Sequence, residues 1–242
     1  MAHRTQQFRD IMKYAHRKSG DDRYGGYNTI ILTGAAGAGK TKAEAKIATD
    51  NVDKSLVLAA GPTASQATNL AESLGVTQQS TVMDFAKSIL GEDVYNDLMA
   101  DINNAKGKQA DQLKSKYFTR IPGQYTRLSI NTNSDGNLVT KDGDEIKFKD
   151  IEKSPKVLVI DEATHIPAPI LQILDLYMGQ KGGQLILIGD EAQNGYWNQE
   201  SGIRSIEANM MFAARAPELT ISLRDNNIQK QANLSAVRAL ID

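Results

Sequence analysis

Short runs of apolar and β-branched residues recur along the chain and alternate with stretches of helical periodicity. A run without polar interruption is typical of a strand that is buried on both faces of a sheet. The runs with this pattern predict core strands at 28–33, 55–60, 156–160, 184–188 and 219–223. Helical periodicity predicts helices at about 42–50, 64–74, 167–178 and 226–241. Alternating strands and helices indicate an α/β protein whose parallel sheet carries helices on both faces.

One stretch interrupts this alternation, because the composition from residue 91 to residue 155 is polar and charged. In its second half, strand-like runs separated by Asp-Gly pairs predict a small meander at 128–132, 137–141 and 145–149. We therefore expect an inserted, β-containing subdomain at 91–155, between the second and third core strands. The main domain would then consist of 1–90 and 156–242.

The composition narrows the class of protein. With 242 residues, 40% hydrophobic and 24% charged, the chain is typical of a globular protein that folds without disulfides. The absence of cysteine excludes a disulfide scaffold, a Cys-ligated metal site and a cysteine nucleophile. The sequence has no membrane-length apolar run and no signal peptide, so we expect a cytosolic protein without a membrane partner. A net charge of -1 means that any nucleic-acid binding requires a local basic patch.

The clearest chemical motif follows the first predicted strand. It is a complete GxxxxGK[ST] loop made of Gly34, Ala35, Ala36, Gly37, Ala38, Gly39, Lys40 and Thr41. The glycines let successive backbone N–H groups point at one phosphate, and the helix that follows adds its positive dipole end. Lys40 would contact the β- and γ-phosphates, and Thr41 would ligate Mg²⁺. The alternative is a Gly-rich turn without a ligand, but chance produces this motif in only about one chain of this size in a hundred.

A second motif supplies the acidic partner that such a loop requires. The apolar strand at 157–160 runs directly into Asp161 and Glu162. Asp161 would hold Mg²⁺ through its water shell, and Glu162 would orient or deprotonate the attacking water. A strand ending in two acids is a weak signal alone, but together with the upstream loop it predicts hydrolysis of ATP or GTP.

The order of the motifs resembles that of the superfamily 1 DNA helicases, in particular the branch containing Dda, RecD and TraI. The matching segments are GAAGAGKT, GPTASQAT at 61–68, STVMDF at 80–85, VLVIDEAT at 157–164, LILIGDEAQ at 185–193 and LTISLR at 219–224. In that family these are motifs I, Ia, Ib, II, III and IV of the first RecA-like domain. The resemblance covers nearly the whole chain, although 91–155 matches in position only. It implies a RecA-like P-loop NTPase fold that uses ATP and Mg²⁺ and binds single-stranded DNA.

The resemblance assigns roles to the catalytic residues. Lys40 would contact the phosphates, Glu162 would be the catalytic glutamate, and Gln193 would sense the γ-phosphate and couple it to the strand-binding surface. Arg224 matches an arginine that contacts the γ-phosphate, which agrees with the need for a cation where charge develops in the transition state. The alternative is that Arg224 is a surface arginine at the start of a helix.

Family members also read adenine with a glutamine upstream of the P-loop. Gln6 and Gln7 lie in that region, and Gln7 is the residue assigned to nucleotide binding. The helical register of the surrounding residues would instead put Arg4 at the equivalent position. His165, close to the Asp-Glu pair, is expected to be structural.

The DNA-binding residues implied by the resemblance come from three motifs. They are Pro62, Thr63 and Ala64 of motif Ia, Ser80 and Thr81 of motif Ib, and Tyr196 and Trp197 after motif III. Met83 stands where the family has a histidine. An aromatic pair on a loop suits base stacking, worth about 1–3 kcal/mol per base. The alternative for Trp197, the only tryptophan of the chain, is a core anchor.

The insertion has a basic segment of its own between 105 and 128. Its basic residues are Lys106, Lys108, Lys114, Lys116, Arg120 and Arg127, and they are interleaved with Tyr117, Phe118 and Tyr125. Such a segment predicts a track for a phosphate backbone. The alternative is a solvated surface.

Three functions remain open from the sequence. The first is the ATP-hydrolysing motor domain of a superfamily 1 helicase, encoded by a phage or plasmid. Translocation would then need a second RecA-like domain, in the same or another chain, because the sequence stops at residue 242 without further motifs. We expect the chain alone to hydrolyse ATP weakly and not to unwind DNA. The alternatives are a P-loop switch ATPase without DNA coupling and a helicase-derived, non-catalytic binding module.

Overall fold

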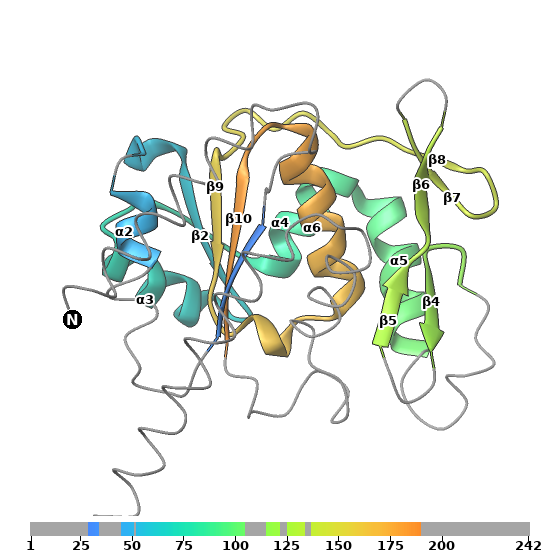
Figure 1. The fold of residues 1–242 in the computed structure, drawn as a ribbon, viewed down its shortest axis with the longest axis horizontal. Helices are drawn as coiled ribbons and strands as arrows, with labels where there is room; N and C mark the ends of the chain where they lie inside the picture. Colours follow the sequence, from blue (N-terminus) through green and yellow to red (C-terminus); the bar gives the residue numbers. More distant parts are fainter. Residues whose placement is uncertain are drawn as a thin grey trace, which may run out of the picture.

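A parallel sheet, with five strands in the described part of the chain, forms the centre of the protein (Figure 1). The computed structural model describes residues 29–33, 45–50, 52–104, 115–121, 125–133 and 137–189. The strands of the sheet are β1 (Thr29–Thr33), β2 (Val57–Gly61), β3 (Gln78–Thr81), β9 (Val157–Ile160) and β10 (Gln184–Gly189). They lie in the order β1-β10-β9-β2-β3, and every neighbouring pair is parallel. The α/β, RecA-like parallel sheet expected of a P-loop NTPase is thereby confirmed.

Helices cover both faces of this sheet (Figure 1). They are α2 (Lys46–Thr49), α3 (Ala64–Leu74), α4 (Val82–Leu90) and α6 (Ala168–Gln180). Leu158 and Leu187 belong to the buried cluster under α4 and α6, whereas Val159 and Ile186 belong to the cluster under α3. Because side chains alternate between the faces of a strand, strands covered on both faces are apolar throughout. This explains why four of the five strands could be predicted from uninterrupted apolar runs.

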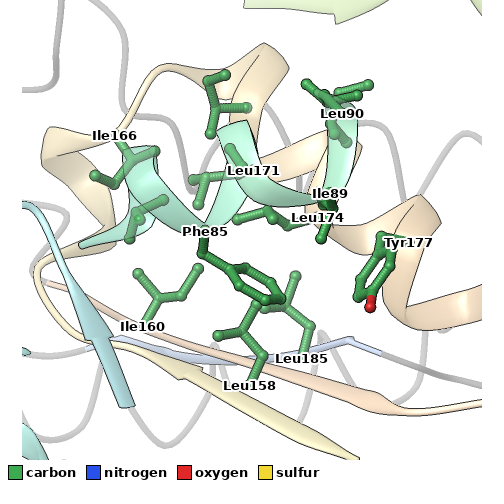
Figure 2. Close-up of a cluster of buried hydrophobic side chains, with 14 of the residues drawn as sticks. Phe85, Ile89, Leu90, Leu158, Ile160, Ile166, Leu171, Leu174, Tyr177 and Leu185 are labelled. Carbon is green, nitrogen blue, oxygen red and sulfur yellow. The ribbon is translucent and has the colours of Figure 1, made fainter. Parts of the chain in front are cut away.

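The larger of the two clusters joins α4 and α6 to the sheet (Figure 2). Phe85 of α4 points onto the strand residues Leu158 and Leu185. Full burial of such a side chain contributes about 1.5–3 kcal/mol relative to exposure. A polar contact adds to this layer, because Thr29 Oγ1 at the start of β1 donates to Oδ1 of buried Asp175 on α6.

The described residues of the inserted region form one helix and five short strands. They are α5 (Glu92–Asn104), β4 (Phe118–Ile121), β5 (Tyr125–Leu128), β6 (Ile130–Thr132), β7 (Leu138–Thr140) and β8 (Glu145–Ile146). β4 and β5 form an antiparallel hairpin, and β6, β7 and β8 form an antiparallel meander. The predicted meander is confirmed, with a shorter last strand. In Figure 1 this region lies beyond α4 and α6 on one side of the molecule.

Several elements differ from the sequence prediction. β3 was not predicted as a strand, and it places the insertion after the third strand of the chain rather than between the second and third. The α4–α5 pair and the hairpin were also missed. Part of the predicted helix at about 42–50 is present as α2 in the described residues. The predicted strand at 219–223 and helix at 226–241 lie outside the described residues.

The inserted region shares the buried core of the main domain. Leu98 and Ile102 of α5, Phe118 of β4 and Leu138 of β7 belong to the same cluster as α4 and α6. The backbone N–H of Lys149, after β8, donates to the carbonyl of Ile89 on α4 at 2.7 Å. The insertion is therefore packed against the layer formed by α4 and α6.

Candidate functional site

The carboxyl ends of the five strands lie along one edge of the sheet. The backbone register pairs Thr33 with Gly189, Leu187 with Ile160, Ala60 with Ile160, and Gly61 with Thr81. The segments that continue from these strand ends are the GAAGAGKT loop after β1, 190–193 after β10, Asp161-Glu162 after β9, 62–64 after β2 and 82–85 after β3. Motifs that are far apart in sequence therefore leave the sheet along one edge.

The order of the strands fixes how these motifs are spaced. β10 lies between β1 and β9, so one strand separates the P-loop strand from the strand that ends in Asp161 and Glu162. Neighbouring strands are about 4.8 Å apart, so the start of the loop and Asp161 are separated by about 10 Å along the edge. That spacing can be bridged by the phosphates of a nucleotide and a hydrated cation.

Many of the predicted site residues lie outside the described part of the chain. These are the loop residues Gly34, Ala35, Ala36, Gly37, Ala38, Gly39, Lys40 and Thr41, together with Gln7, Gln193, Tyr196, Trp197 and Arg224. The structure does describe the strands that precede two of these motifs, which are β1 before the P-loop and β10 before 190–193. Asp161, Glu162 and the residues of motifs Ia and Ib are described.

Asp161 and Glu162 adopt a strongly constrained arrangement. The N–H of Asp161 donates to the carbonyl of Ala60 on β2 at 3.1 Å, which extends the β9–β2 ladder to the acid itself. The N–H of Glu162 then donates to Oδ1 of Asp161 at 2.9 Å. Glu162 has φ 51° and ψ 38°, and it is the only non-glycine residue with positive φ in the described ranges. Left-handed backbone costs an L residue about 1–2 kcal/mol, and strain of this kind clusters at functional sites.

The turn after Glu162 is anchored by buried apolar residues. Ala163–His165 form a 3₁₀ turn, in which the N–H of His165 donates to the carbonyl of Glu162 at 3.0 Å. Ala163 within the turn and Ile166 directly after it are fully buried, and α6 begins two residues later. The carboxylates are thus held between β9 and α6 and not on a free loop.

One carboxylate oxygen at this edge has no hydrogen-bond partner among the described residues. Glu162 Oε2 is buried and accepts no hydrogen bond within the described structure, and the same holds for Thr164 Oγ1 in the same turn. An unpaired buried acceptor costs about 1–3 kcal/mol unless a donor such as water satisfies it. Glu162 therefore presents an acceptor suited to a water molecule.

The residues described here fit a hydrated magnesium ion. Mg²⁺ takes oxygen ligands, keeps several waters and is usually held by one or two carboxylates together with substrate phosphates. Asp161 supplies such a carboxylate beside an acceptor for water on Glu162. Within the described residues, no three His, Asp or Glu side chains form a cluster that could hold a metal by themselves.

The threonines of motifs Ia and Ib cap two neighbouring helices. Thr63 Oγ1 accepts from the N–H of Gln66 at the start of α3, and Thr81 Oγ1 accepts from the N–H of Asp84 at the start of α4. Because β2 and β3 are paired, both helix N-termini begin at the same edge of the sheet. Their dipoles and N–H groups create positive potential that suits a phosphate.

The other residues of these motifs vary in exposure. Pro62 is half-buried and Ala64 is exposed, so the backbone before α3 is accessible. Ser80 Oγ donates to the carbonyl of Thr81 at 3.0 Å. Met83 packs partly buried against the core cluster under α4, which accounts for an apolar residue at this position.

In the basic segment of the insertion, the structure describes the side chains of Lys116, Tyr117 and Phe118, and these contact other residues of the protein. Lys116 Nζ lies 2.7 Å from Asp97 Oδ2 and 3.4 Å from Asp144 Oδ2, and the hydrogen bond to Asp97 raises the pKa of its ammonium group. Tyr117 and Phe118 are buried in the core. Burial and a hydrogen bond to Asp97 raise the pKa of Tyr117 to about 12. These residues attach β4 to α5.

Comparison with known proteins identifies one matching family. A family model described as an AAA domain matches residues 25–240, a range that includes all six motifs. No curated protein matched the chain. No helix in the described ranges is long and apolar enough to cross a membrane.

Proposed function

Because the chain belongs to the AAA domain family of P-loop ATPases, which is associated with superfamily 1 helicases, we propose that it is the motor domain of a DNA helicase. In this proposal the domain binds and hydrolyses ATP with magnesium and couples hydrolysis to movement on single-stranded DNA. The family supports a nucleotide-binding ATPase in general. Coupling to DNA is the step that the proposal adds.

The observation that carries the proposal is the alignment of motifs along one edge of the sheet. Along this edge, in the order of the strands from β1 to β3, lie the start of the P-loop, the segment after Gly189, the pair Asp161-Glu162, and the capped N-termini of α3 and α4. Nucleotide chemistry would occupy one end and phosphate contacts to a strand the other. A change at Glu162 is then only one or two strands away from Thr63 and Thr81.

Within this proposal, the described residues act on the attacking water and the cation. ATP supplies the γ-phosphoryl group, and magnesium neutralises charge on its oxygens. Asp161 would hold the hydrated cation with its carboxylate. Glu162 would accept a hydrogen bond from the water and then its proton, because its side chain is partly exposed at the edge of the sheet directly after Asp161. The constrained backbone of Glu162 keeps that carboxylate at the edge.

The DNA side of the proposal depends on two helix N-termini. α3 and α4 begin beside each other, so their free N–H groups could contact successive phosphates of a strand. By resemblance to the family, translocation would require closure of a second RecA-like domain, in this chain or another. We expect the domain by itself to hydrolyse ATP without unwinding a duplex.

A switch ATPase without DNA coupling is the second candidate, and one observation favours it. Both threonine hydroxyls are already engaged in capping α3 and α4, which is a complete structural reason for their presence. Under this alternative, the N-termini would serve only the fold.

Steady-state ATPase activity with and without single-stranded DNA decides between the two functions. Lys40→Ala is the blank, and Glu162→Gln should retain nucleotide and strand binding while turnover falls by about 100-fold or more. Stimulation by the strand that disappears in both variants supports the motor domain. Hydrolysis that is indifferent to DNA supports the switch ATPase, and a chain that binds neither nucleotide nor strand contradicts both.

A further inference from the structure

His165 lies next to the unpaired oxygen of Glu162. Its Nε2 atom is 3.9 Å from Glu162 Oε2, and the two residues are three positions apart across the 3₁₀ turn. At this distance there is no hydrogen bond, which requires about 2.7–3.2 Å between nitrogen and oxygen. A side-chain movement of about 1 Å would form one.

The imidazole is not a core side chain. The side chain of His165 is 46% exposed, whereas Ala163 and Ile166 around it are fully buried. What His165 contributes to the turn is its backbone N–H, which any residue except proline can supply. Packing therefore does not explain a histidine at this position.

The backbone geometry directs Glu162 and His165 toward each other. The left-handed conformation of Glu162 turns the chain sharply at the end of β9, so that the carboxylate lies over its own turn. The N–H of Glu162 is bound to Asp161 and its carbonyl is bound to His165, so the backbone on both sides of the carboxylate is fixed. The carboxylate itself is the remaining mobile group, and a donor on the turn can restrict it.

We propose that His165 is a positioning residue for Glu162, and that its imidazole N–H holds Oε2 in the orientation in which the carboxylate accepts a proton from water. The inference rests on the proposed ATPase function, because it gives His165 a role only where Glu162 activates a water. Hydrogen bonds of catalytic groups are often long without substrate and shorten in the substrate complex. A bound nucleotide would shorten this one.

Three substitutions separate a positioning role from a structural one. His165→Ala and His165→Phe both remove the N–H donor, and His165→Phe retains a planar ring. His165→Gln retains an N–H donor that can reach the carboxylate. We expect the Ala and Phe variants to lower kcat about 10-fold, typical for loss of a group that orients a catalytic ligand. KM for ATP should stay within about two-fold in all three, and Gln should restore most of kcat.

A second background tests whether the effect passes through Glu162. In Glu162→Gln the same His165→Ala substitution should leave the residual rate unchanged, because the carboxylate that it orients is gone. The inference is overturned if Ala and Phe leave kcat unchanged, or if the 10-fold loss persists in the Glu162→Gln background. Failure of the proposed function would look different, since the parent chain would then show no hydrolysis dependent on Lys40 or Glu162.

A spectroscopic measurement gives an answer without turnover. The sequence has only three histidines, so ¹⁵N-histidine labelling yields few signals, and His165→Gln assigns the one of interest. With a non-hydrolysable ATP analogue and magnesium, the Nε2 resonance of His165 should move when Glu162 is replaced by Gln. It should not move in Glu72→Gln, which removes an exposed carboxylate of α3. A resonance that is insensitive to Glu162 overturns the inference.

Discussion

Phe148 and Tyr177 pack edge to face, with ring centroids 5.2 Å apart and ring planes at 86°. Phe148 follows β8 in the inserted region, and Tyr177 lies on α6, fully buried. Phe85 of α4 meets Tyr177 in a second edge-to-face contact at 5.8 Å, and Ser154 Oγ lies 2.7 Å from the Tyr177 hydroxyl. The end of the insertion is thus attached to α4 and α6, the two helices that cover one face of the sheet.

Substitutions at this aromatic contact should destabilise the whole domain. Phe148→Ala should lower the free energy of unfolding by about 2–3 kcal/mol, less than for a fully buried phenylalanine because Phe148 is only partly buried. Tyr177→Phe should cost about 1 kcal/mol, because it retains the ring contacts and loses one hydrogen bond. Urea unfolding followed by circular dichroism measures both, with Phe148→Leu as the control for side-chain volume. A separate early transition of the insertion would contradict the shared core.

Glu162→Gly should make the protein more stable and inactive. Glycine adopts positive φ without the steric cost that an L residue meets, and the substitution also removes the buried, unpaired Oε2. We expect a gain of about 1 kcal/mol over Glu162→Ala, which removes the carboxylate but keeps Cβ. Thermal and urea unfolding of the two variants provide the comparison. Equal stability of the two variants would show that the backbone conformation carries no strain.

Aspartate at Thr63 and Thr81 should separate capping from DNA binding. Aspartate caps a helix as well as threonine does, so Thr63→Asp should change stability by less than about 0.5 kcal/mol, whereas alanine should cost about 1 kcal/mol at each site. Thr81→Asp should also cost about 1 kcal/mol, because the Thr81 hydroxyl donates to Asp84 Oδ2 at 2.7 Å and a carboxylate there would lose that bond and repel Asp84. The added charges repel phosphate, so affinity for single-stranded DNA should fall at least about 10-fold at low salt. Fluorescence anisotropy with a labelled oligonucleotide measures this, and Asn69→Asp on the exposed surface of α3 is the control for added charge. Unchanged affinity would remove these N-termini from the DNA site.

The pair Asp97 and Lys116 should make stability depend on acid pH. The hydrogen bond from Lys116 holds the pKa of Asp97 below its usual value of 3.8. A carboxyl group with a lowered pKa in the folded state stabilises the protein above the unfolded pKa, and this contribution disappears as pH falls through the folded value. Half of the Asp97 side chain is exposed, so solvent screening keeps the effect below about 1 kcal/mol.

Asp97→Asn isolates that charge, because asparagine can still accept the hydrogen bond from Tyr117. The variant should be less stable than the parent at pH 6, and the two should converge as pH falls below about 3.8. Urea unfolding at a series of pH values measures the difference. A difference that stays constant across this range would mean that the ion pair contributes nothing.

The sequence was sufficient to predict the strands that are buried on both faces. β1, β2, β9 and β10 are continuous apolar runs because helices cover each side of the sheet. β3 reads QQST and lies at the edge of the sheet, where its side chains are mostly half-exposed. It is a strand because its backbone pairs with β2. Backbone pairing does not require apolar side chains, so the sequence shows no pattern for it. The β4–β5 hairpin also lacks an uninterrupted apolar run. Its basic and aromatic residues predicted a nucleic-acid surface instead.

The site was predictable in its residue types but not in its geometry. An apolar strand ending in Asp161 and Glu162 marked the acids correctly at the carboxyl end of β9. Nothing in the sequence indicated positive φ at Glu162, since neither glycine nor asparagine occupies that position. The short distance between His165 Nε2 and Glu162 Oε2 depends on that backbone conformation and on the 3₁₀ turn. A histidine three positions after an acid at a strand end carries no such signal by itself.

The position of β10 has a consequence for how this domain folds as it is synthesised. Within the described residues β1 pairs only with β10, although the two strands are about 150 residues apart in sequence. While the ribosome makes the intervening helices and the insertion, the strand that leads into the P-loop has no neighbour on which to order. ATP can therefore stabilise only a nearly complete domain, and any chain interrupted before β10 would be left with an exposed apolar strand for chaperones and proteases to recognise.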